Sequence, residues 1–211
     1  MVRSIRLMAG GLFALALATG AAGAARAQGT VTELPAEGFR PRPVREGTLS
    51  LSGGGQYGSF FGRSDFGKDF DQGLGLGFRV RYRTDTASAL GLSFESQVYG
   101  ARVASVADTA AKSLQIIVNT LDYYRYMKTR SRMPRYWVLG AGLAQVRQKD
   151  NGGDREFPGD GGVFTAGLGA ERWMNRNLTL DLGLRYYGVL HRSRLSHAAQ
   201  AGVALNFYTS P

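Results

Sequence analysis

Two patterns in the chain place side chains where they could do chemistry. The first is His191-Arg192-Ser193, with His197 close behind it. A histidine base could activate a serine hydroxyl for attack on an acyl ester, provided that a carboxylate orients the imidazole. No Asp or Glu follows Asp181 in the chain. A solvated loop is therefore the simpler interpretation, and the sequence assigns no catalytic residue.

The second pattern is a set of charges that recur in separated segments, always on the polar side of an alternating run. Residues 73–84, GLGLGFRVRYRT, show it best, because three arginines alternate with apolar residues. The full set contains four arginines and four carboxylates: Arg79, Arg81, Arg83, Glu95, Asp122, Glu171, Asp181 and Arg185. Buried charges are tolerated when they are paired and hydrogen-bonded, so we expect ion pairs that serve packing rather than catalysis.

These charges need strands to position them. Successive side chains of a strand point to opposite faces, so residues 73–84 have one apolar face and one face with three arginines. Taken alone, this run fits a strand of a soluble antiparallel sandwich as well as a strand of a membrane barrel. In the barrel, the apolar face contacts lipid and the polar face lines a narrow interior.

The rest of the chain favours the barrel, because alternation of this kind recurs eight times. Long polar connections alternate with short ones, with the possible exception of the last, as in barrels with short turns at one end. We therefore predict an all-β fold, an eight-stranded antiparallel up-and-down transmembrane β-barrel over residues 47–208. The segments are 48–61, 73–84, 88–99, 114–127, 136–146, 163–173, 178–188 and 197–208.

In two segments the alternation does not settle which side chains point outward. In residues 114–127, an inward Asp122 places Asn119 outward, so a bulge or a tilted rim position is possible. Residues 136–146 are rich in small side chains, and the pattern only favours an outward face. That face contains Trp137, Leu139, Ala141 and Leu143.

The N-terminal part has a different composition. Residues 1–27 combine Arg3 and Arg6, an apolar run and a small-x-small site, which is typical of a cleaved secretory signal peptide; an uncleaved membrane anchor is the alternative. Its removal would leave about +7 of the formal charge of +10. Residues 28–46 hold three prolines and no periodicity, so we expect an extended lead-in.

Composition excludes several kinds of site. The chain has no cysteine and two histidines, so thiol chemistry, disulfides and common metal-ligand spacings are absent from the sequence. No cofactor motif is present, and the basic residues form no stripe or helix that would predict nucleic-acid binding. We expect no cofactor, no metal and no nucleic-acid partner.

The segments resemble the OmpA-like and OmpX-like group of small outer-membrane β-barrel proteins. The resemblance rests on the signal peptide, the eight segments, the repeats at 140–143 and 167–171, and an aromatic residue near the end of the last segment. It implies export to the cell outer membrane, contact with outer-membrane lipids, insertion by the barrel assembly machinery, and a monomer. Thr209, Ser210 and Pro211 follow the terminal aromatic pair, which departs from the usual assembly signal.

These observations predict a non-enzymatic barrel with a salt-bridged, plugged lumen and a structural or surface-interaction role for its extracellular loops. A small passive pore is the alternative. A second alternative is a lipid A acyl hydrolase, because His191 and Ser193 are similar to the His-x-Ser of outer-membrane lipid A deacylases. Basic loop residues could contact lipopolysaccharide phosphates, although general solvation explains them equally well. They are Arg63, Lys68, Arg102, Lys112, Arg192 and Arg194.

Overall fold

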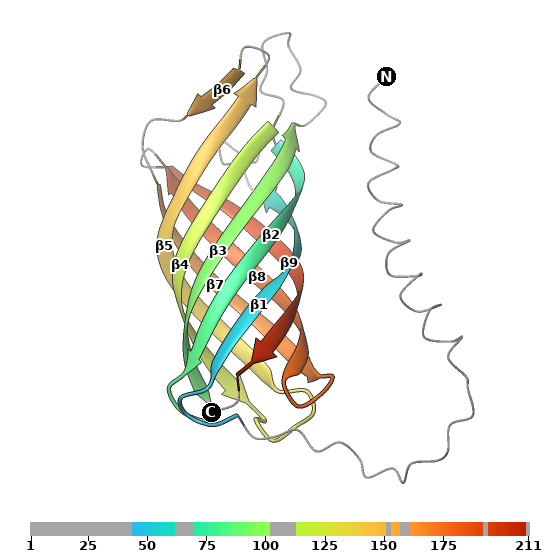
Figure 1. Ribbon diagram of the computed structural model, residues 1–211. Coiled ribbons are helices and arrows are strands. Elements are labelled where there is room, and N and C mark those ends of the chain that lie inside the picture. Colours follow the sequence, from blue (N-terminus) through green and yellow to red (C-terminus); the bar gives the residue numbers. More distant parts are fainter. Residues whose placement is uncertain are drawn as a thin grey trace, which may run out of the picture. The chain divides into compact units, whose positions relative to one another are not determined.

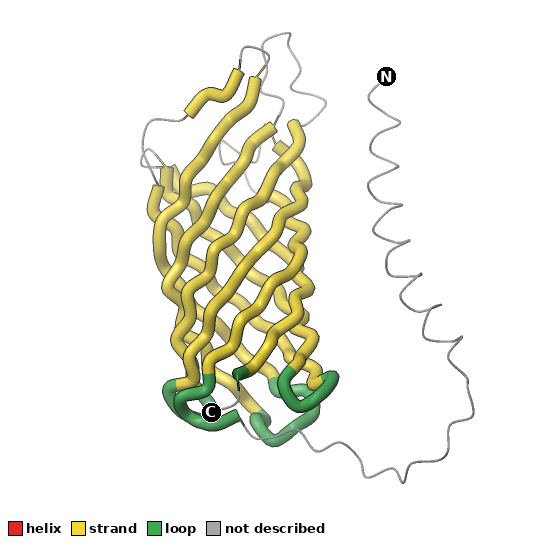
Figure 2. Tube along the Cα trace, in the orientation of Figure 1, coloured by secondary structure: helices red, strands yellow, loops and turns green. Residues whose placement is uncertain are grey.

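The alternation of apolar and polar residues builds strands throughout the described chain. The computed structural model describes residues 44–61, 70–101, 113–150, 153–156, 161–191 and 194–209. Within these ranges the chain forms nine strands in one sheet, and no helix is long and apolar enough to cross a membrane (Figures 1 and 2). The strands are β1 Leu49–Phe61, β2 Phe70–Arg83, β3 Ser88–Ala101, β4 Ser113–Met127, β5 Arg135–Asp150, β6 Gly153–Glu156, β7 Gly161–Trp173, β8 Leu178–His191 and β9 Arg194–Tyr208.

Eight of the strands close into a barrel. Each pairs antiparallel with its neighbours along the chain, β5 pairs with β7, and β1 pairs with β9. The closing register runs from Ser50 opposite Tyr208 to Phe61 opposite His197. Closure satisfies the backbone hydrogen bonds that an open edge would leave exposed. The predicted eight-stranded antiparallel barrel is confirmed.

The strand β6 is an addition that the sequence did not predict. Residues expected in a polar loop instead fold back on β5, with Lys149 opposite Asp154 and Asp150 opposite Gly153. The sequence between them is Asn151-Gly152, a pair typical of two-residue hairpin turns. Within the described sheet, β6 pairs only with β5, so it extends one hairpin and takes no part in closing the barrel.

The two faces of the wall differ sharply in exposure. The outward Leu76 and Leu184 are 73% and 64% exposed, whereas the inward Arg81 is 1% exposed. A soluble protein buries its leucines and solvates its arginines, so this inverted arrangement fits a lipid-facing exterior. The predicted faces are confirmed, including the outward Trp137 face of β5.

Strand β4 resolves the ambiguity at Asn119. Its register with both neighbours is continuous, and burial alternates without interruption from Leu114 to Tyr126. Asp122 therefore points inward and Asn119 outward with no bulge in β4. A register shift occurs instead between Phe70 and Gly73 of β2, where it pairs with β3.

The connections are sorted by end. Residues 84–87, 128–134 and 174–177 join strands at the end where β1 begins and β9 finishes, here named the short-turn end (Figure 1). At the opposite, long-loop end, the connections are longer, except for the two residues between β8 and β9. The sorting that the sequence predicted is confirmed, as is its exception.

Two of the short turns close in the same way. Asp85 Oδ1 accepts hydrogen bonds from the backbone N–H groups of Ala87 and Ser88, at 2.5 and 2.8 Å. Asn175 Oδ1 likewise accepts from the N–H groups of Asn177 and Leu178. Such side-chain bonds stabilise tight turns. These hydrogen bonds, chiefly the one from the N–H of Ala87, lower the pKa of Asp85 below its usual value.

One inward glycine marks a close approach between the first and last strands. A Cβ on Gly54 would lie 2.1 Å from the carbonyl oxygen of Val203 and 2.5 Å from Cα of Ala204. A Cβ on the outward neighbour Gly53 would meet no atom within 4 Å. The pairing of β1 with β9 therefore requires glycine at position 54, whereas the adjacent position 53 has room for a side chain.

We predict that Gly54→Ala destabilises the barrel by about 1–3 kcal/mol, because backbone atoms of β9 must move to admit the methyl group. Gly53→Ala is the matched control and should leave stability unchanged or raise it slightly. The temperature at which the folded band disappears from a semi-native gel measures both. Equal midpoints for the two variants would contradict the close approach.

Candidate functional site

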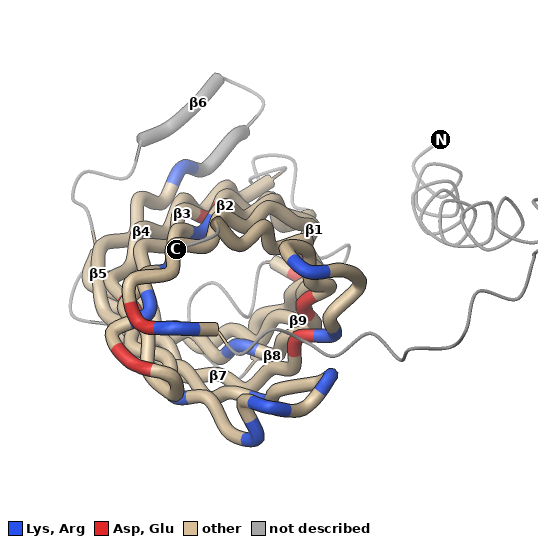
Figure 3. The backbone as a smooth tube through the Cα atoms, turned by 60° about the horizontal axis from the view of Figure 1, so that its bottom comes forward, with Lys and Arg blue, Asp and Glu red and all other residues tan. Residues whose placement is uncertain are grey.

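All eight predicted charges point into the barrel. Seven of them form ion pairs with partners on other strands, at N···O distances of 2.6–3.6 Å. Figure 3 shows the barrel from the short-turn end, with its charged positions in colour. The structure thus brings charges from separated strands together inside the barrel.

The ion pairs nearest the short-turn end centre on Arg81. Its Nη1 lies 2.6 Å from Glu171 Oε1 and its Nη2 lies 3.5 Å from Asp181 Oδ2. These contacts join β2 to β7 and β8 across the lumen. All three side chains are at most 2% exposed, so the charges are removed from water and depend on one another.

A second set lies further from the short-turn end. Arg79 Nη2 contacts Glu95 at 2.8 Å, and Arg185 contacts Asp122 at 2.9 Å and Glu95 at 3.6 Å. The four side chains form an alternating chain of charges from β2 through β3 and β8 to β4. Ser93 also donates its hydroxyl to Asp122, which satisfies a further lone pair of that carboxylate.

Arg83 is held differently. Its guanidinium carbon lies 3.3 Å from the centroid of the Tyr126 ring, and its Nη2 lies 3.5 Å from the Tyr208 hydroxyl. A cation over an aromatic face is stabilised by the ring quadrupole, more strongly where water is excluded. The arginine that the sequence grouped with the ion pairs is thus stabilised chiefly by rings.

Tyrosines complete the site, and sequence reasoning missed them. Each of the four carboxylates accepts a hydrogen bond from at least one inward tyrosine hydroxyl. Their signal was available, because Tyr124 and Tyr126 share the parity of Asp122, and Tyr187 shares that of Arg185. The bonds run from Tyr126 and Tyr208 to Glu171, from Tyr136 to Asp181, from Tyr124 to Asp122, and from Tyr187 to Glu95.

The half of the lumen toward the long loops is apolar, which the sequence did not predict. Leu114, Ile116 and Val118 of β4 point inward and are at most 5% exposed. They pack in one cluster with inward side chains of the other strands. The members are Phe60, Phe70, Tyr99, Leu114, Ile116, Val118, Ala144, Val146, Val163, Tyr187, Val189 and Ala198.

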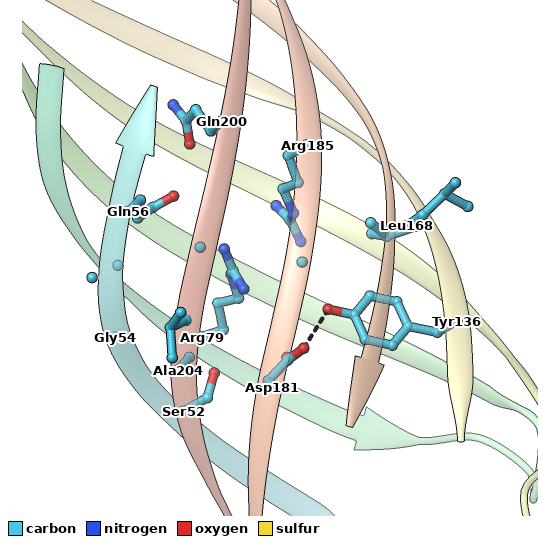
Figure 4. A pocket seen from close by; sticks show the side chains of 16 residues that line it. Ser52, Gly54, Gln56, Arg79, Tyr136, Leu168, Asp181, Arg185, Gln200 and Ala204 are labelled. Atoms are coloured by element: carbon cyan, nitrogen blue, oxygen red, sulfur yellow. Dashed lines mark hydrogen bonds between the residues drawn. The ribbon is translucent and has the colours of Figure 1, made fainter. Parts of the chain in front are cut away.

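A small polar cavity lies in the middle of the lumen (Figure 4). Its volume is about 20 Å³, enough for a water molecule. Arg79 and Arg185 reach toward it, and Figure 4 shows the Tyr136 hydroxyl bonded to Asp181 at its wall. Among described residues, Ser52 Oγ, Gln56 Nε2 and Gln200 Oε1 have no protein partner, so these cavity atoms are suited to bind water.

The structure describes only part of the hydrolase motif. His197 lies on the outer wall, where its Nδ1 and the Tyr186 hydroxyl share a hydrogen bond of 2.6 Å. Its ring also stacks against Phe61 at a centroid distance of 5.9 Å. Ser193 lies outside the described residues, and only the backbone of His191 is described. Asp181 is committed to Arg81 inside the lumen.

Most of the proposed lipopolysaccharide contacts fall outside the described chain. Arg63, Lys68, Arg102, Lys112 and Arg192 lie in undescribed connections, and Arg194 is described by its backbone alone. These contacts stay predictions. Among described residues, no group of three or more His, Cys, Asp or Glu side chains could hold a metal ion.

We predict that Glu171→Ala strongly destabilises the barrel, because it leaves the buried guanidinium of Arg81 with its weaker partner, Asp181. Breaking a buried pair by removing one partner typically costs about 3–5 kcal/mol. Glu46→Ala, at an exposed carboxylate of the same end, is the control. The urea midpoint of unfolding in detergent measures both, and similar midpoints would show that the Arg81 contacts contribute little.

Comparison with known proteins agrees with this geometry at the level of the fold. No protein-family model and no curated protein matches the sequence. Three solved structures, each 12–16% identical to this chain, share its architecture. Neisserial surface protein A matches with a TM-score of 0.60 and 14% identity, over 77% of this chain and 99% of its own.

The other two are Ail, the attachment invasion locus protein of Yersinia pestis, and the outer membrane protein OprG of Pseudomonas aeruginosa. Ail has a TM-score of 0.53 and 16% identity, over 78% of this chain and 99% of its own. OprG has a TM-score of 0.54 and 12% identity, over 79% and 98%. The chain therefore has the eight-stranded fold of the small outer-membrane β-barrel proteins.

Proposed function

We propose that this protein is a non-enzymatic outer-membrane barrel whose lumen is closed to solutes and whose long loops carry a structural or surface-interaction role. The observation that carries the proposal is the filling of the lumen in two layers. Ion pairs and tyrosines fill the half toward the short turns, and apolar side chains fill the half toward the long loops.

Placement in the outer membrane is supported by the exterior. Outward leucines on many strands are about half exposed or more, among them Leu76, Leu121, Leu168 and Leu184. An apolar belt of this kind would aggregate in water and is stabilised by lipid. The signal-like residues 1–27 would direct the chain out of the cytoplasm.

Closure is supported by the size of the spaces inside. The central cavity of about 20 Å³ and a second of about 10 Å³, beside Tyr99 and Ile116, hold little more than single waters. An ion entering from the long-loop end would have to cross the apolar layer and lose its water there. A lumen whose side chains stabilise the barrel, rather than conduct solutes, explains why the inward charges are paired with one another.

The loops are the part of the molecule left to interact. The name of Ail, the Yersinia pestis protein, refers to attachment and invasion, so a barrel of this fold is compatible with a role in adhesion. The six basic residues proposed to contact lipopolysaccharide belong to the long-loop connections. Guanidinium and ammonium groups would bind its phosphates through charge-assisted hydrogen bonds.

We predict that the purified barrel, reconstituted in a planar bilayer, gives no steady conductance above the leak of the lipid. The buried ion pairs and the apolar layer would each block a continuous column of water. The alternative of a small passive pore rests on the polar cavity lined by Gln56 and Gln200. Reproducible unitary steps in salt solution would favour that alternative and exclude a closed lumen.

We also predict that incubation with lipid A releases no fatty acid. His197 is bonded to Tyr186, and Asp181 is bonded inside the lumen, so neither supports a histidine–serine pair at residues 191 and 193. Mass spectrometry of the lipid detects any loss of an acyl chain. Release that disappears in both His191→Ala and Ser193→Ala would establish the acyl hydrolase in place of the proposed role.

A further inference from the structure

The positive charge of the barrel is concentrated at the short-turn end. Its four segments, 44–47, 84–87, 125–135 and 172–177, contain eight Lys and Arg against two Asp and Glu. The connecting segments of the opposite end, 62–71, 102–112, 147–160 and 192–194, contain nine against eight. Because the lumen charges balance, nearly all the excess positive charge of the barrel lies beside the short turns.

Six of these cations are exposed, and together they are here named the basic rim. It comprises Lys128, Arg130, Arg132, Arg135, Arg172 and Arg176, all exposed to solvent. None of the six forms an ion pair with a described residue. Figure 3, which brings the short-turn end forward, shows basic segments along these turns.

Backbone hydrogen bonds bring the two parts of the rim together. The N–H of Trp173 donates to the carbonyl of Arg132 at 3.1 Å, and the N–H of Glu171 donates to the carbonyl of Pro134 at 3.0 Å. The connection between β4 and β5 therefore runs along the end of β7. Like charges on adjoining segments repel one another, so the arrangement favours a bound anion.

Neighbouring side chains place the rim at the depth of lipid headgroups. Trp137 and Tyr123 lie on the outer wall next to it, with ring centroids 5.6 Å apart, in the manner of an interfacial aromatic girdle. Met133 and Met174 lie within the turns themselves and are 43% and 59% exposed. Exposed apolar side chains interleaved with arginines suit a surface that contacts lipid.

We propose that the basic rim binds the phosphate groups of anionic phospholipids in the leaflet that faces the short turns. Guanidinium groups bind phosphate through paired hydrogen bonds, and several of them converge here. The inference rests on the membrane placement proposed above, and it adds a lipid preference on the side of the barrel away from the long loops. Zwitterionic lipids alone would leave the rim without a net counter-charge.

Trp137 provides the test, because it lies on the lipid-facing wall beside the rim. The mature barrel is reconstituted in vesicles of phosphatidylcholine and phosphatidylglycerol in which one or the other lipid has brominated acyl chains. Bromine quenches nearby indole fluorescence. The chain has two tryptophans, and Trp173 is 7% exposed inside the barrel, so Trp137→Phe gives the background.

At equal mole fractions, brominated phosphatidylglycerol should quench Trp137 more strongly than brominated phosphatidylcholine. The relative binding constant should be about fivefold, the ratio expected from one cation near a charged headgroup. Concentrated salt should reduce it. The variant R130Q/R132Q/R135Q/R172Q/R176Q should bring the ratio close to one. Lys128, which has a φ of 53°, is left unchanged in this variant.

The matched control neutralises five cations of the other end, R63Q/K68Q/R102Q/K112Q/R192Q, and should keep the full preference. If the five-residue rim variant does not fold, R130Q/R176Q changes the turns alone and should lower the ratio. A wild-type ratio near one, an unchanged ratio in the rim variants or an equal fall in the control would overturn the inference. A barrel that fails to enter vesicles at all would instead overturn the membrane placement.

Discussion

The interior of this barrel is too narrow to hold unpaired charge, and the rest of the structure depends on that constraint. Eight strands enclose a space that side chains fill. Four arginines project into it. Because water is largely excluded there, each guanidinium needs a partner from the protein. Carboxylates from β3, β4, β7 and β8 pair with three of the arginines, and the ring of Tyr126 lies against Arg83. Tyrosine hydroxyls bind the remaining carboxylate lone pairs. The inward glycines make room for these long side chains; Gly167 is one, with Arg185 beside it.

The fold could be predicted from the sequence because lipid and lumen impose opposite preferences on alternate residues. In β2, β8 and β9, apolar and polar side chains alternate so regularly that both faces were assigned correctly. The lumen charges followed from the same rule. The hairpin of β6 was not predicted, because the polar composition of residues 147–160 is that of a loop.

The apolar layer could not be found in this way, and neither could the carboxylate partners of the inward tyrosines. Where the inward residues of β4 are Leu114, Ile116 and Val118, the outward ones are Gln115, Ile117 and Asn119, so the usual contrast between an apolar outer face and a polar inner face disappears. Tyrosine is ambiguous for a different reason, since its ring suits lipid and its hydroxyl suits a carboxylate. Tyr123 and Tyr124 are adjacent and point to opposite faces. Parity places Tyr124 inward, but only the three-dimensional arrangement shows that its hydroxyl binds Asp122.

The ion pairs of Arg81 also bear on the order in which the wall can assemble. Arg81 meets Glu171 and Asp181 across sequence separations of 90 and 100 residues, whereas the Arg79 and Glu95 pair spans 16. A partly built sheet containing β1 to β4 would carry the Arg81 guanidinium into the bilayer without its carboxylates. That intermediate would be costly, so we expect insertion to be coupled to closure, with the two halves of the chain meeting before Arg81 enters the lipid.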